Sequence, residues 1–461
     1  MSQSTSSGDV RAGFRLRTIH LFQLVPWIAI VVAARQPIRD NSFLWHVRAG
    51  TLQLDAGEVL RTDPFSFTYG GRPWRTQSWL ADVAYGALER QFGHALSWVS
   101  WLDIALFGAT LVLMAMLIHR ATRSVAATAV SVFVLGWLAV PFVNPRPVAF
   151  SFLALVALMA ALERRFRWAV PLIIWIWAAL HGSFIVGIGL VVLDAVRRRD
   201  RSATRLVGLS ILAASLTAHG LAIWEVLAQF GRSRDALGLI TEWQPPNLMS
   251  IPTLPYAALI VVVLIGATRR SIATGDLWVV APFLVFGLTS GRAVLVGAIV
   301  VLPFAAQALS DPVGPKPDNQ TGGPPPALVG AVGVVILILP FLLAAGPASL
   351  DEERFPIDAA AVLAPVPTFH GDVEGGYLIF ERWPEQLVFT DDRAELYGGE
   401  FFRAFVEARG AVPGWEALFM EWDIAQALLP VDAPLAGVLA SSNEWSEEFR
   451  DSAFVVFVRS S

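Results

Sequence analysis

Long apolar runs, separated by short polar segments, fill the first three quarters of the chain. Several of them are shorter than the ~20 residues that a helix needs to cross the hydrocarbon of a bilayer. Such short helices are tolerated where neighbouring protein or a water-filled cavity shields the backbone. The pattern therefore predicts an α-helical polytopic membrane protein with about eleven transmembrane helices. The eleven runs are 21–34, 96–118, 125–143, 148–162, 168–180, 184–196, 206–218, 254–267, 277–289, 293–309 and 327–345.

The composition agrees with a membrane protein. Of the 461 residues, 55% are hydrophobic and 16% are charged, and the mean hydropathy is +0.57. Soluble domains carry roughly 25% charged residues. The net charge of −4 gives no basic signature for nucleic acid. The absence of cysteine excludes disulfides and thiol chemistry.

Arginines orient the chain, because cytoplasmic loops of membrane proteins carry an excess of positive charge. With eleven spans and an interior N-terminus, all five basic clusters fall inside. A single long helix through His181-Gly182 would reduce the count to ten and move the last cluster outside, so we prefer eleven. The clusters are Arg11/Arg15/Arg17, His119-Arg120/Arg123, Arg164/Arg165/Arg167, Arg197–Arg199/Arg201/Arg205 and Arg269/Arg270.

The first apolar run has two interpretations, a cleavable signal peptide or a first transmembrane helix. No small-residue cleavage site of the A-x-A type precedes the polar loop, which favours the helix. We then expect a cytoplasmic tail over 1–18 and a transmembrane domain over 19–347. The transmembrane domain includes an exterior loop at 35–93, with a helix at 76–92, and a Pro/Gly-rich interior linker at 311–326.

The last part of the chain, 348–461, is expected to form a small extracytoplasmic α/β domain. Short apolar runs there alternate with amphipathic stretches. Strands are predicted at 377–380, 387–390 and 453–458, and helices are predicted near 401–409 and 415–422.

Unusual polar residues gather on the exterior side of this topology. Burying such groups near lipid is expensive, so a shared face of titratable side chains indicates an active or binding site. The residues are Asp40, His46, Asp63, Arg146, His181, His219, Glu242 and Arg292.

Two carboxylates are candidates for catalysis. Asp40 follows the first span closely, at the depth of a lipid head group, and could act as general base toward an acceptor hydroxyl. The alternative is helix capping, or pairing with Arg39 or Arg48. Asp63, in Thr-Asp-Pro, could equally cap a turn, because Asp before Pro favours turn initiation.

Arg146 stands between two prolines in a tight exterior turn, which fixes its backbone. Arginine suits bidentate recognition of phosphate, although the side chain could also snorkel to lipid phosphates. His181 lies at a break between two apolar runs, where free backbone groups often line a site, and His219 repeats that pattern. Trp74 could be an interfacial anchor.

Several chemistries are disfavoured. The chain has no Walker motif, dinucleotide fingerprint, G-x-S-x-G or H-E-x-x-H. A divalent metal stays open, but His46, His181 and His219 come from separate segments without zinc-type spacing.

Six segments carry a family resemblance. They are DNSFLWHVRAG, TDPFSFTYGGRPWRTQSWL, NPRP, WAALHGSF, ITEWQPPN and GGYLIF…VFTDDRAELYG. They resemble a family of bacterial multi-span membrane proteins that is similar to GT-C-type glycosyltransferases, which include protein mannosyltransferases and lipid A aminoarabinose transferases. The resemblance covers most of the chain from Asp40 to about Pro430.

The resemblance implies a multi-pass enzyme of the bacterial plasma (inner) membrane that takes sugar from a polyprenyl-phosphate donor at the outer face. The acceptor would be a glycan or a protein. The family's catalytic base is an acidic residue just after the first span, which Asp40 matches by position. Many GT-C enzymes have an adjacent acidic pair, whereas Asn41 follows here; Asp63 could supply the second carboxylate.

The same resemblance suggests roles for the other polar and aromatic residues. Arg146, Arg292 and Arg48 would hold the donor phosphate. Sugar and acceptor contacts would come from His46, Trp45, Trp74, His181, His219, Glu242 and Trp243.

Two other functions compete with a transferase. A transporter or flippase for lipid-linked saccharides would need charges deep within spans, where Asp103 and Asp194 are nearly alone. A non-catalytic scaffold for envelope glycan assembly would use the exterior constellation only to hold loop and tail together. The Asp391-Asp392-Arg393 loop could likewise bind sugar or form a buried ion pair.

Overall fold

A computed structural model describes residues 25–93, 96–163, 166–199, 201–232, 244–310 and 349–460. The predicted interior linker at 311–326 and the predicted last span at 327–345 lie outside these residues, and so does the whole predicted N-terminal tail at 1–18.

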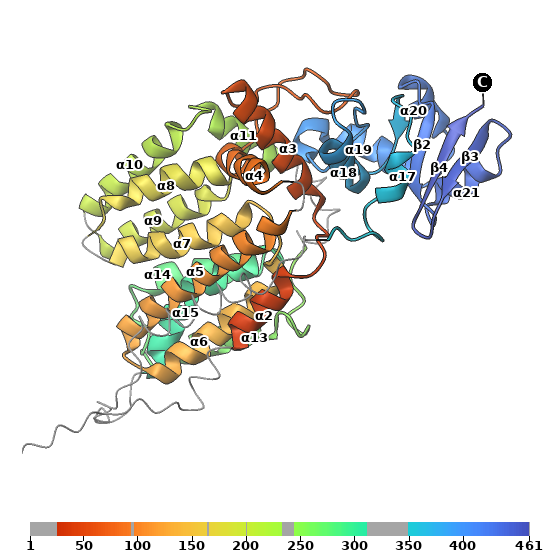
Figure 1. The fold of residues 1–461 in the computed structure, drawn as a ribbon. Helices are drawn as coiled ribbons and strands as arrows, with labels where there is room; N and C mark the ends of the chain where they lie inside the picture. Colours follow the sequence, from red (N-terminus) through yellow and green to blue (C-terminus); the bar gives the residue numbers. More distant parts are fainter. Residues whose placement is uncertain are drawn as a thin grey trace, which may run out of the picture.

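Most of the described residues up to 310 are helical, and these helices lie together on one side of the molecule (Figure 1). Each predicted span within the described residues corresponds to one helix, so the apolar runs were interpreted correctly as helices. The helices are α2 (Val25–Ala34), α3 (Asn41–Ala56), α4 (Trp79–Phe92), α5 (Ser97–Thr122), α6 (Val125–Ala139), η1 (Val140–Phe142), α7 (Val148–Glu163), α8 (Ala169–Leu180), α9 (Phe184–Arg198), α10 (Arg201–Ser215), α11 (Ala222–Arg232), α13 (Leu254–Thr268), α14 (Leu277–Phe286) and α15 (Ala293–Ser310).

Three helices of the described residues are long and apolar enough to cross a membrane: Trp98–Thr122, Val125–Phe142 and Ala293–Ser310. Five others are apolar but shorter, at 10–17 residues. Large apolar side chains on the outer helices are exposed, as lipid contact requires; Leu212, Leu216 and Leu264 are examples. The protein is therefore a membrane protein, and the count of eleven spans stays a prediction.

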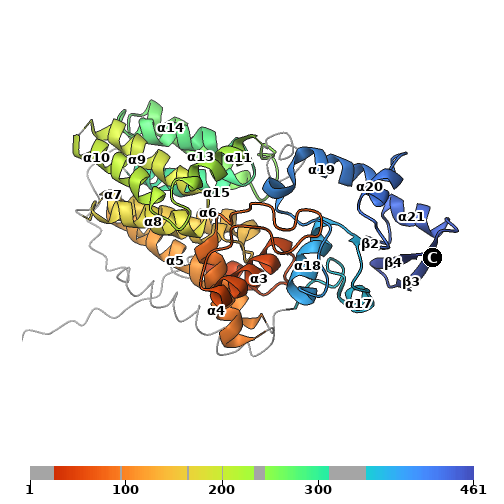
Figure 2. The same cartoon turned by 90° about the horizontal axis from the view of Figure 1, so that it is seen from above.

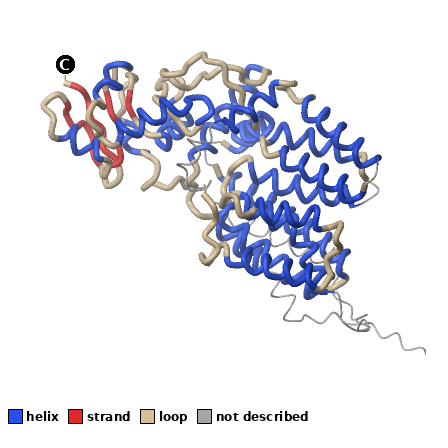
Figure 3. The backbone as a smooth tube through the Cα atoms, turned by 180° about the vertical axis from the view of Figure 1, so that it is seen from behind, coloured by secondary structure: helices blue, strands red, loops and turns tan. Residues whose placement is uncertain are grey.

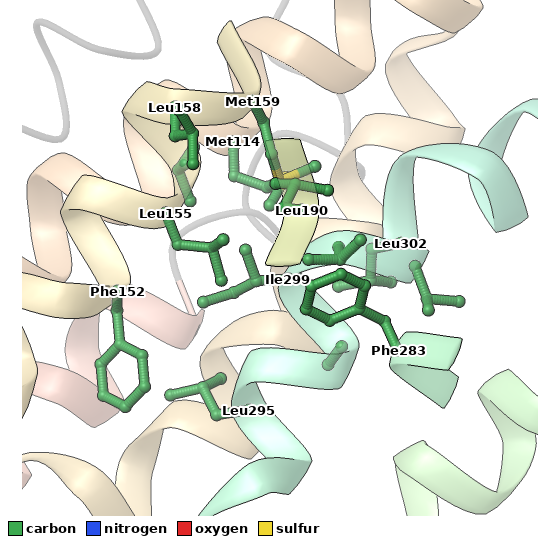
Figure 4. Packing of buried hydrophobic residues seen from close by; sticks show 14 of the residues in the cluster. Met114, Phe152, Leu155, Leu158, Met159, Leu190, Phe283, Leu295, Ile299 and Leu302 are labelled. Atoms are coloured by element: carbon green, nitrogen blue, oxygen red, sulfur yellow. The ribbon is translucent and has the colours of Figure 1, made fainter. Parts of the chain in front are cut away.

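Helix α15 lies at the centre of the bundle and packs against α5, α6, α7, α13 and α14. Its neighbours contribute large apolar side chains, among them Met114 of α5 and Phe152 of α7 (Figure 4). Ile299 of α15 is fully buried among them. This core fixes the helix ends from which the polar residues project.

The chain breaks at His181, as the sequence predicts. Helix α8 ends at Leu180, His181 is extended with φ −166°, and α9 begins at Phe184. Two helices thus replace one long helix through this position.

Two further helices, α3 and α4, come from the loop predicted at 35–93 and pack against each other. The helix predicted at 76–92 is α4, which begins at Trp79. Helix α3 was not predicted. Gly50 of α3 and Gly86 of α4 touch through their backbones, because a Cβ on Gly50 would lie 1.8 Å from the Asp82 carbonyl oxygen.

The C-terminal part holds a four-stranded sheet at the far end of the molecule (Figure 3). The strand order is β1-β2-β4-β3, with β1 parallel to β2 and the other pairs antiparallel. The strands are β1 (Thr368–Phe369), β2 (Gln426–Pro430), β3 (Trp445–Arg450) and β4 (Phe454–Arg459). The accompanying helices are α17 (Ile357–Ala361), α18 (Asp372–Arg382), α19 (Ala394–Arg409), α20 (Glu416–Glu421) and α21 (Pro434–Ala440).

Two of the three strands predicted here are wrong. Residues 377–380 lie inside α18, because a short apolar run buried on all sides cannot be told from a strand by its periodicity. Residues 387–390 form only one bridge, between Val388 and Ser66. The third prediction corresponds to β4, and the helices near 401–409 and 415–422 correspond to α19 and α20. Strands β1, β2 and β3 were missed.

Helix α18 joins the two parts of the molecule because it packs directly on α3 (Figure 2). Gly376 permits this approach, since a Cβ there would meet the Asn41 carbonyl oxygen at 2.6 Å. The Asn41 side chain also donates to the Asp372 carbonyl oxygen at 3.3 Å. The C-terminal part therefore lies against the first turn of α3.

Candidate functional site

Asp40 caps the N-terminus of α3. Its backbone is extended, with φ −92° and ψ 114°, and Oδ1 accepts from the Phe43 N–H at 3.1 Å. The other oxygen, Oδ2, accepts from Nε of Arg146. The side chain thus caps a helix and forms an ion pair, but with Arg146 in place of the expected Arg39 or Arg48. Arg39 pairs instead with Asp351, at 3.0 Å.

Arg146 reaches Asp40 from the Pro-framed turn before α7. The Arg146 N–H donates to the Asn144 carbonyl oxygen at 2.7 Å, which tightens the turn. The Arg146 side chain is 23% exposed and that of Asp40 is 5% exposed. The Arg146 side chain is therefore partly exposed, whereas the carboxylate that it contacts is shielded.

Asp392, from the loop between α18 and α19, provides a second carboxylate at the same turn of α3. Its Oδ1 accepts from Nε1 of Trp45 at 2.7 Å, and its Oδ2 accepts from the Ser42 hydroxyl. Burial raises the pKa of Asp392 to about 6. The charges of Asp391 and Asp40 add to this rise, whereas the Ser42 hydrogen bond and Arg146 oppose it.

The sequence analysis missed Asp392 as a member of this site. It sought the second carboxylate beside Asp40 or at Asp63, but position 41 is Asn and the partner comes from far along the chain. The available signal was an acidic pair, Asp391-Asp392, directly after an apolar run, which had been interpreted as a separate sugar-binding loop or an ion pair.

Asp63 lies in a different, fully buried ion cluster. Its carboxylate accepts from the N–H groups of Phe65 and Ser66, both at 3.1 Å, as the turn interpretation predicts. Oδ1 also accepts from Nη1 of Arg393 at 2.7 Å, and both side chains are 0% exposed. Asp63 thus joins the exterior loop to the C-terminal part.

Arg393 is the centre of that cluster. It donates to both oxygens of Asp391, at 2.7 and 2.6 Å, and the Tyr397 hydroxyl donates to Asp391 at 2.8 Å. Its guanidinium lies 4.5 Å from the ring centre of Trp74. Burial lowers the pKa of Arg393, but Asp391, Tyr397 and Asp63 together outweigh this cost and raise the pKa well above its usual value.

His46 forms a pair with Asp82 of α4. Nδ1 of His46 lies 2.5 Å from Oδ1 of Asp82, and the ring stacks on Trp45 with a centroid distance of 3.6 Å. Asp82 also accepts from the Thr76 hydroxyl at 2.7 Å. His219 reaches the same segment, because its Nε2 donates to the Thr76 carbonyl oxygen at 2.7 Å.

His181 and Arg292 line the neighbouring side. The charges of His46, Arg146 and Arg292 all reach His181 electrostatically. Its Nδ1 lies 2.8 Å from the Ser183 hydroxyl oxygen, which donates to the Ser151 hydroxyl oxygen. The structure therefore brings His46, Arg146, His181 and Arg292 into one neighbourhood.

The remaining predicted residues are spread out. Arg48 donates to the carbonyl oxygens of Ile379 and Phe380 and so holds the end of α18. Nε1 of Trp74 donates to Glu395 at 3.3 Å. Glu242 and Trp243 lie outside the described residues. Within the described ranges, no group of three or more His, Cys, Asp or Glu side chains could hold a metal ion.

Comparisons with known proteins agree with the fold. No protein-family model matches the chain, and no curated protein matches it. Among solved structures, the chain is similar to ArnT from Cupriavidus metallidurans bound to undecaprenyl phosphate, with a TM-score of 0.51 and 18% identity. That match covers 95% of this chain and 97% of ArnT.

A second similar structure is the archaeal oligosaccharyltransferase AglB from Archaeoglobus fulgidus, in complex with an inhibitory peptide and a dolichol-phosphate. The TM-score is 0.50 at 11% identity, over 96% of this chain and 74% of AglB. At such identities the likeness concerns the fold. The resemblance to GT-C-type glycosyltransferases that the sequence indicates is thereby confirmed, and the chain has the fold of these membrane proteins.

Proposed function

We propose that this protein is a GT-C-type glycosyltransferase that moves a sugar from a polyprenyl-phosphate donor to a hydroxyl acceptor at the outer face of the membrane. The observation that carries the proposal is the contact between Asp40 and Arg146. A shielded carboxylate and a reachable arginine meet directly after the first predicted span. The similar structures contain undecaprenyl phosphate and dolichol-phosphate, which supports a polyprenyl-phosphate ligand here.

The pair supplies a base and a phosphate ligand. The donor phosphate would take Arg146, because arginine binds phosphate strongly through paired hydrogen bonds. Asp40 Oδ2 would then be released to accept the proton of the acceptor hydroxyl. The acceptor oxygen bonds to the anomeric carbon, and the bond from that carbon to the phosphate oxygen breaks. Its electron pair leaves with the polyprenyl phosphate, which Arg146 holds.

The other predicted residues take supporting roles in this proposal. Trp45 stacks on His46 and donates to Asp392, and the charges of His46, Arg146 and Arg292 reach His181. We assign these residues, together with His219, to contacts with sugar, acceptor or phosphate. We assign Asp63, Arg48 and Trp74 to the joining of loop and C-terminal part, because their polar atoms bond there.

The charges within the helices give less support to a transporter. Asp194 of α9 bonds to Arg198 at 2.8 Å and to Arg167 at 3.4 Å, so its charge is compensated at the end with the arginines. Asp103 of α5 is buried within electrostatic reach of Asp40. It therefore belongs to the neighbourhood of the proposed site.

Lipid mass spectrometry on cells that lack the protein tests the proposal. A polyprenyl-phosphate sugar should accumulate, a glycan or protein should lose a sugar, and the wild-type chain should reverse both changes. Asp40→Asn should lower turnover by at least about 100-fold, the range typical of a removed general base, and so fail to restore the product. The comparison with wild type requires that the Asp40→Asn protein is present in the membrane at the wild-type level.

The matched control is Asp55→Asn, which alters an exposed carboxylate near the other end of α3 that pairs with Arg90. It should restore the product as wild type does. Full rescue by Asp40→Asn would overturn the assignment of the base, and the absence of any accumulating lipid-linked sugar would overturn the transferase.

A further inference from the structure

The proposed phosphate site has a second carboxylate near Arg146. Arg146 faces two carboxylates: Asp40, which it contacts, and Asp392, which its charge reaches. A site for an anionic phosphate would bind more tightly without the second carboxylate. The presence of Asp392 therefore needs an explanation beyond donor binding.

The position of Asp392 is firmly held. Hydrogen bonds from Ser42 and Trp45 fix both of its oxygens against the first turn of α3, whose N-cap is Asp40. On either side of it in the chain, Asp391 and Arg393 are locked into the buried cluster. Asp391 and Arg393 thus act as positioning residues, and Asp392 alone faces the proposed site.

The charge of the phosphate changes during the proposed reaction. A polyprenyl-phosphate sugar is a phosphodiester with one negative charge. The departing polyprenyl phosphate is a monoester, and such a group carries about −1.5 to −2 at pH 7. Repulsion from a fixed carboxylate therefore acts about twice as strongly on the product as on the donor.

We propose that Asp392 is a specificity residue of this site, which favours the singly charged phosphodiester donor over the doubly charged phosphomonoester and so promotes product release. This inference rests on the proposed function. It assigns to the C-terminal part a direct role in the catalytic cycle, in addition to its packing against α3.

Other charged and titratable groups face the same region. Asp391 adjoins Asp392, and Tyr85 of α4 and Asp103 of α5 lie within electrostatic reach of Asp40. His181 and Arg292 lie on the side of Arg146, together with His46. A pH effect is therefore assigned to Asp392 only where Asp392→Asn abolishes it.

The test is a binding measurement on the purified full chain in detergent, with two probes: undecaprenyl phosphate and its methyl ester, a phosphodiester. Asparagine has nearly the same shape as aspartate. At position 392 its side-chain oxygen can accept from Trp45 and its NH2 group can donate to the Ser42 hydroxyl, so both hydrogen-bond partners are retained. Asp392→Asn at pH 7.5 should tighten binding of undecaprenyl phosphate by about tenfold and of the methyl ester by about threefold. Asp432→Asn, an exposed carboxylate in the C-terminal part, is the matched control and should change neither.

The pH dependence gives a second, independent arm. Burial raises the pKa of Asp392 to about 6, so its charge is largely lost at pH 5. Wild type should then bind the methyl ester about threefold more tightly at pH 5 than at pH 7.5, while Asp392→Asn stays constant. The diester phosphate itself does not titrate in this range, so the difference between wild type and Asp392→Asn reports the titration of Asp392.

Equal changes for the two probes, or none, would overturn the role of Asp392. Failure of the proposed function gives a different result: either wild type does not bind undecaprenyl phosphate, or Arg146→Met binds it as tightly as wild type. Loss of binding in Arg146→Met together with unchanged selectivity in Asp392→Asn would retain the function and reject the inference.

Discussion

Two ion clusters of the same composition lie side by side in this protein, and each combines two aspartates with one arginine. In the first, Asp63 and Asp391 enclose Arg393, and all three side chains are 0% exposed. In the second, Asp40 and Asp392 flank Arg146, which is 23% exposed. Both clusters form hydrogen bonds within the protein, but the arginine of the second cluster is partly exposed whereas that of the first is fully buried. Burial and accessibility, rather than residue types, distinguish a structural cluster from a proposed catalytic one.

The largest expected effect comes from breaking the closed cluster. Arg393→Met would leave Asp63 and Asp391 buried without their cation, and removing one partner of a buried ion pair typically costs about 3–5 kcal/mol. We expect a strongly lowered thermal midpoint in detergent and little monodisperse protein on size exclusion. Arg450→Met, at an exposed pair with Glu447, should leave both unchanged. A thermal midpoint of Arg393→Met equal to that of wild type would contradict the structural role assigned to the buried cluster.

A smaller loss of stability is expected when Tyr397, which donates a hydrogen bond to the same cluster, is changed. Tyr397→Phe removes the hydroxyl that donates to Asp391 at 2.8 Å. A hydrogen bond to a charged group contributes about 1.5–3 kcal/mol, so the free energy of unfolding should fall by about 2 kcal/mol. Tyr69→Phe is a suitable comparison, because its hydroxyl donates at 3.0 Å to an uncharged acceptor, the Tyr397 carbonyl oxygen. Denaturation in detergent should show the larger loss for Tyr397→Phe; the reverse order would contradict it.

The smallest effect has the opposite sign and concerns the open cluster. Burial raises the pKa of Asp392 from its ordinary value of 3.8 to about 6 in the folded protein. Folding therefore disfavours the charged form, and stability is lost as the pH rises from about 4 through 6. At pH 7.5, Asp392→Asn should stabilise the protein by about 1 kcal/mol, reduced from the full linkage value because the side chain is partly exposed.

The stabilisation should be much smaller near pH 4, where Asp392 is protonated in the folded state and about half protonated in the unfolded state. Thermal midpoints of wild type and Asp392→Asn at pH 7.5 and pH 4 measure the difference. A variant less stable than wild type at pH 7.5 would place Asp392 among the structural residues, with Asp63 and Asp391.

Much of the fold could be predicted from the sequence, because each helix of the bundle corresponds to a continuous apolar run. The sequence-based predictions fail for segments that do not have one buried and one exposed face. Helix α3 mixes Trp45, His46 and Arg48 within one turn, so no apolar stripe marks it as a helix. Residues 377–380 are buried all round, which hides the period that separates a helix from a strand.

For the site, the sequence predicts on which side of the membrane the residues lie, but not which of them are in contact. Positive-inside reasoning placed Asp40 and Arg146 on the same side, but the contact between them requires the packing of α2, α3 and the turn before α7. Asp392 was beyond reach, because its neighbours Ser42 and Trp45 are remote in the chain. Local patterns carry no information about which distant segments meet.

The close approach at Gly376 has a consequence for the life of the chain in the cell. The first carboxylate leaves the ribosome early, whereas the loop that carries the second is made only after the whole bundle. Helix α18 must then come to rest against the Asn41 backbone with no side chain between them. A nascent or truncated chain would thus have a base and a phosphate ligand but no means of rejecting spent lipid. Under the proposed function, repeated turnover starts only after the segment that carries Asp392 has been made and has docked on α3.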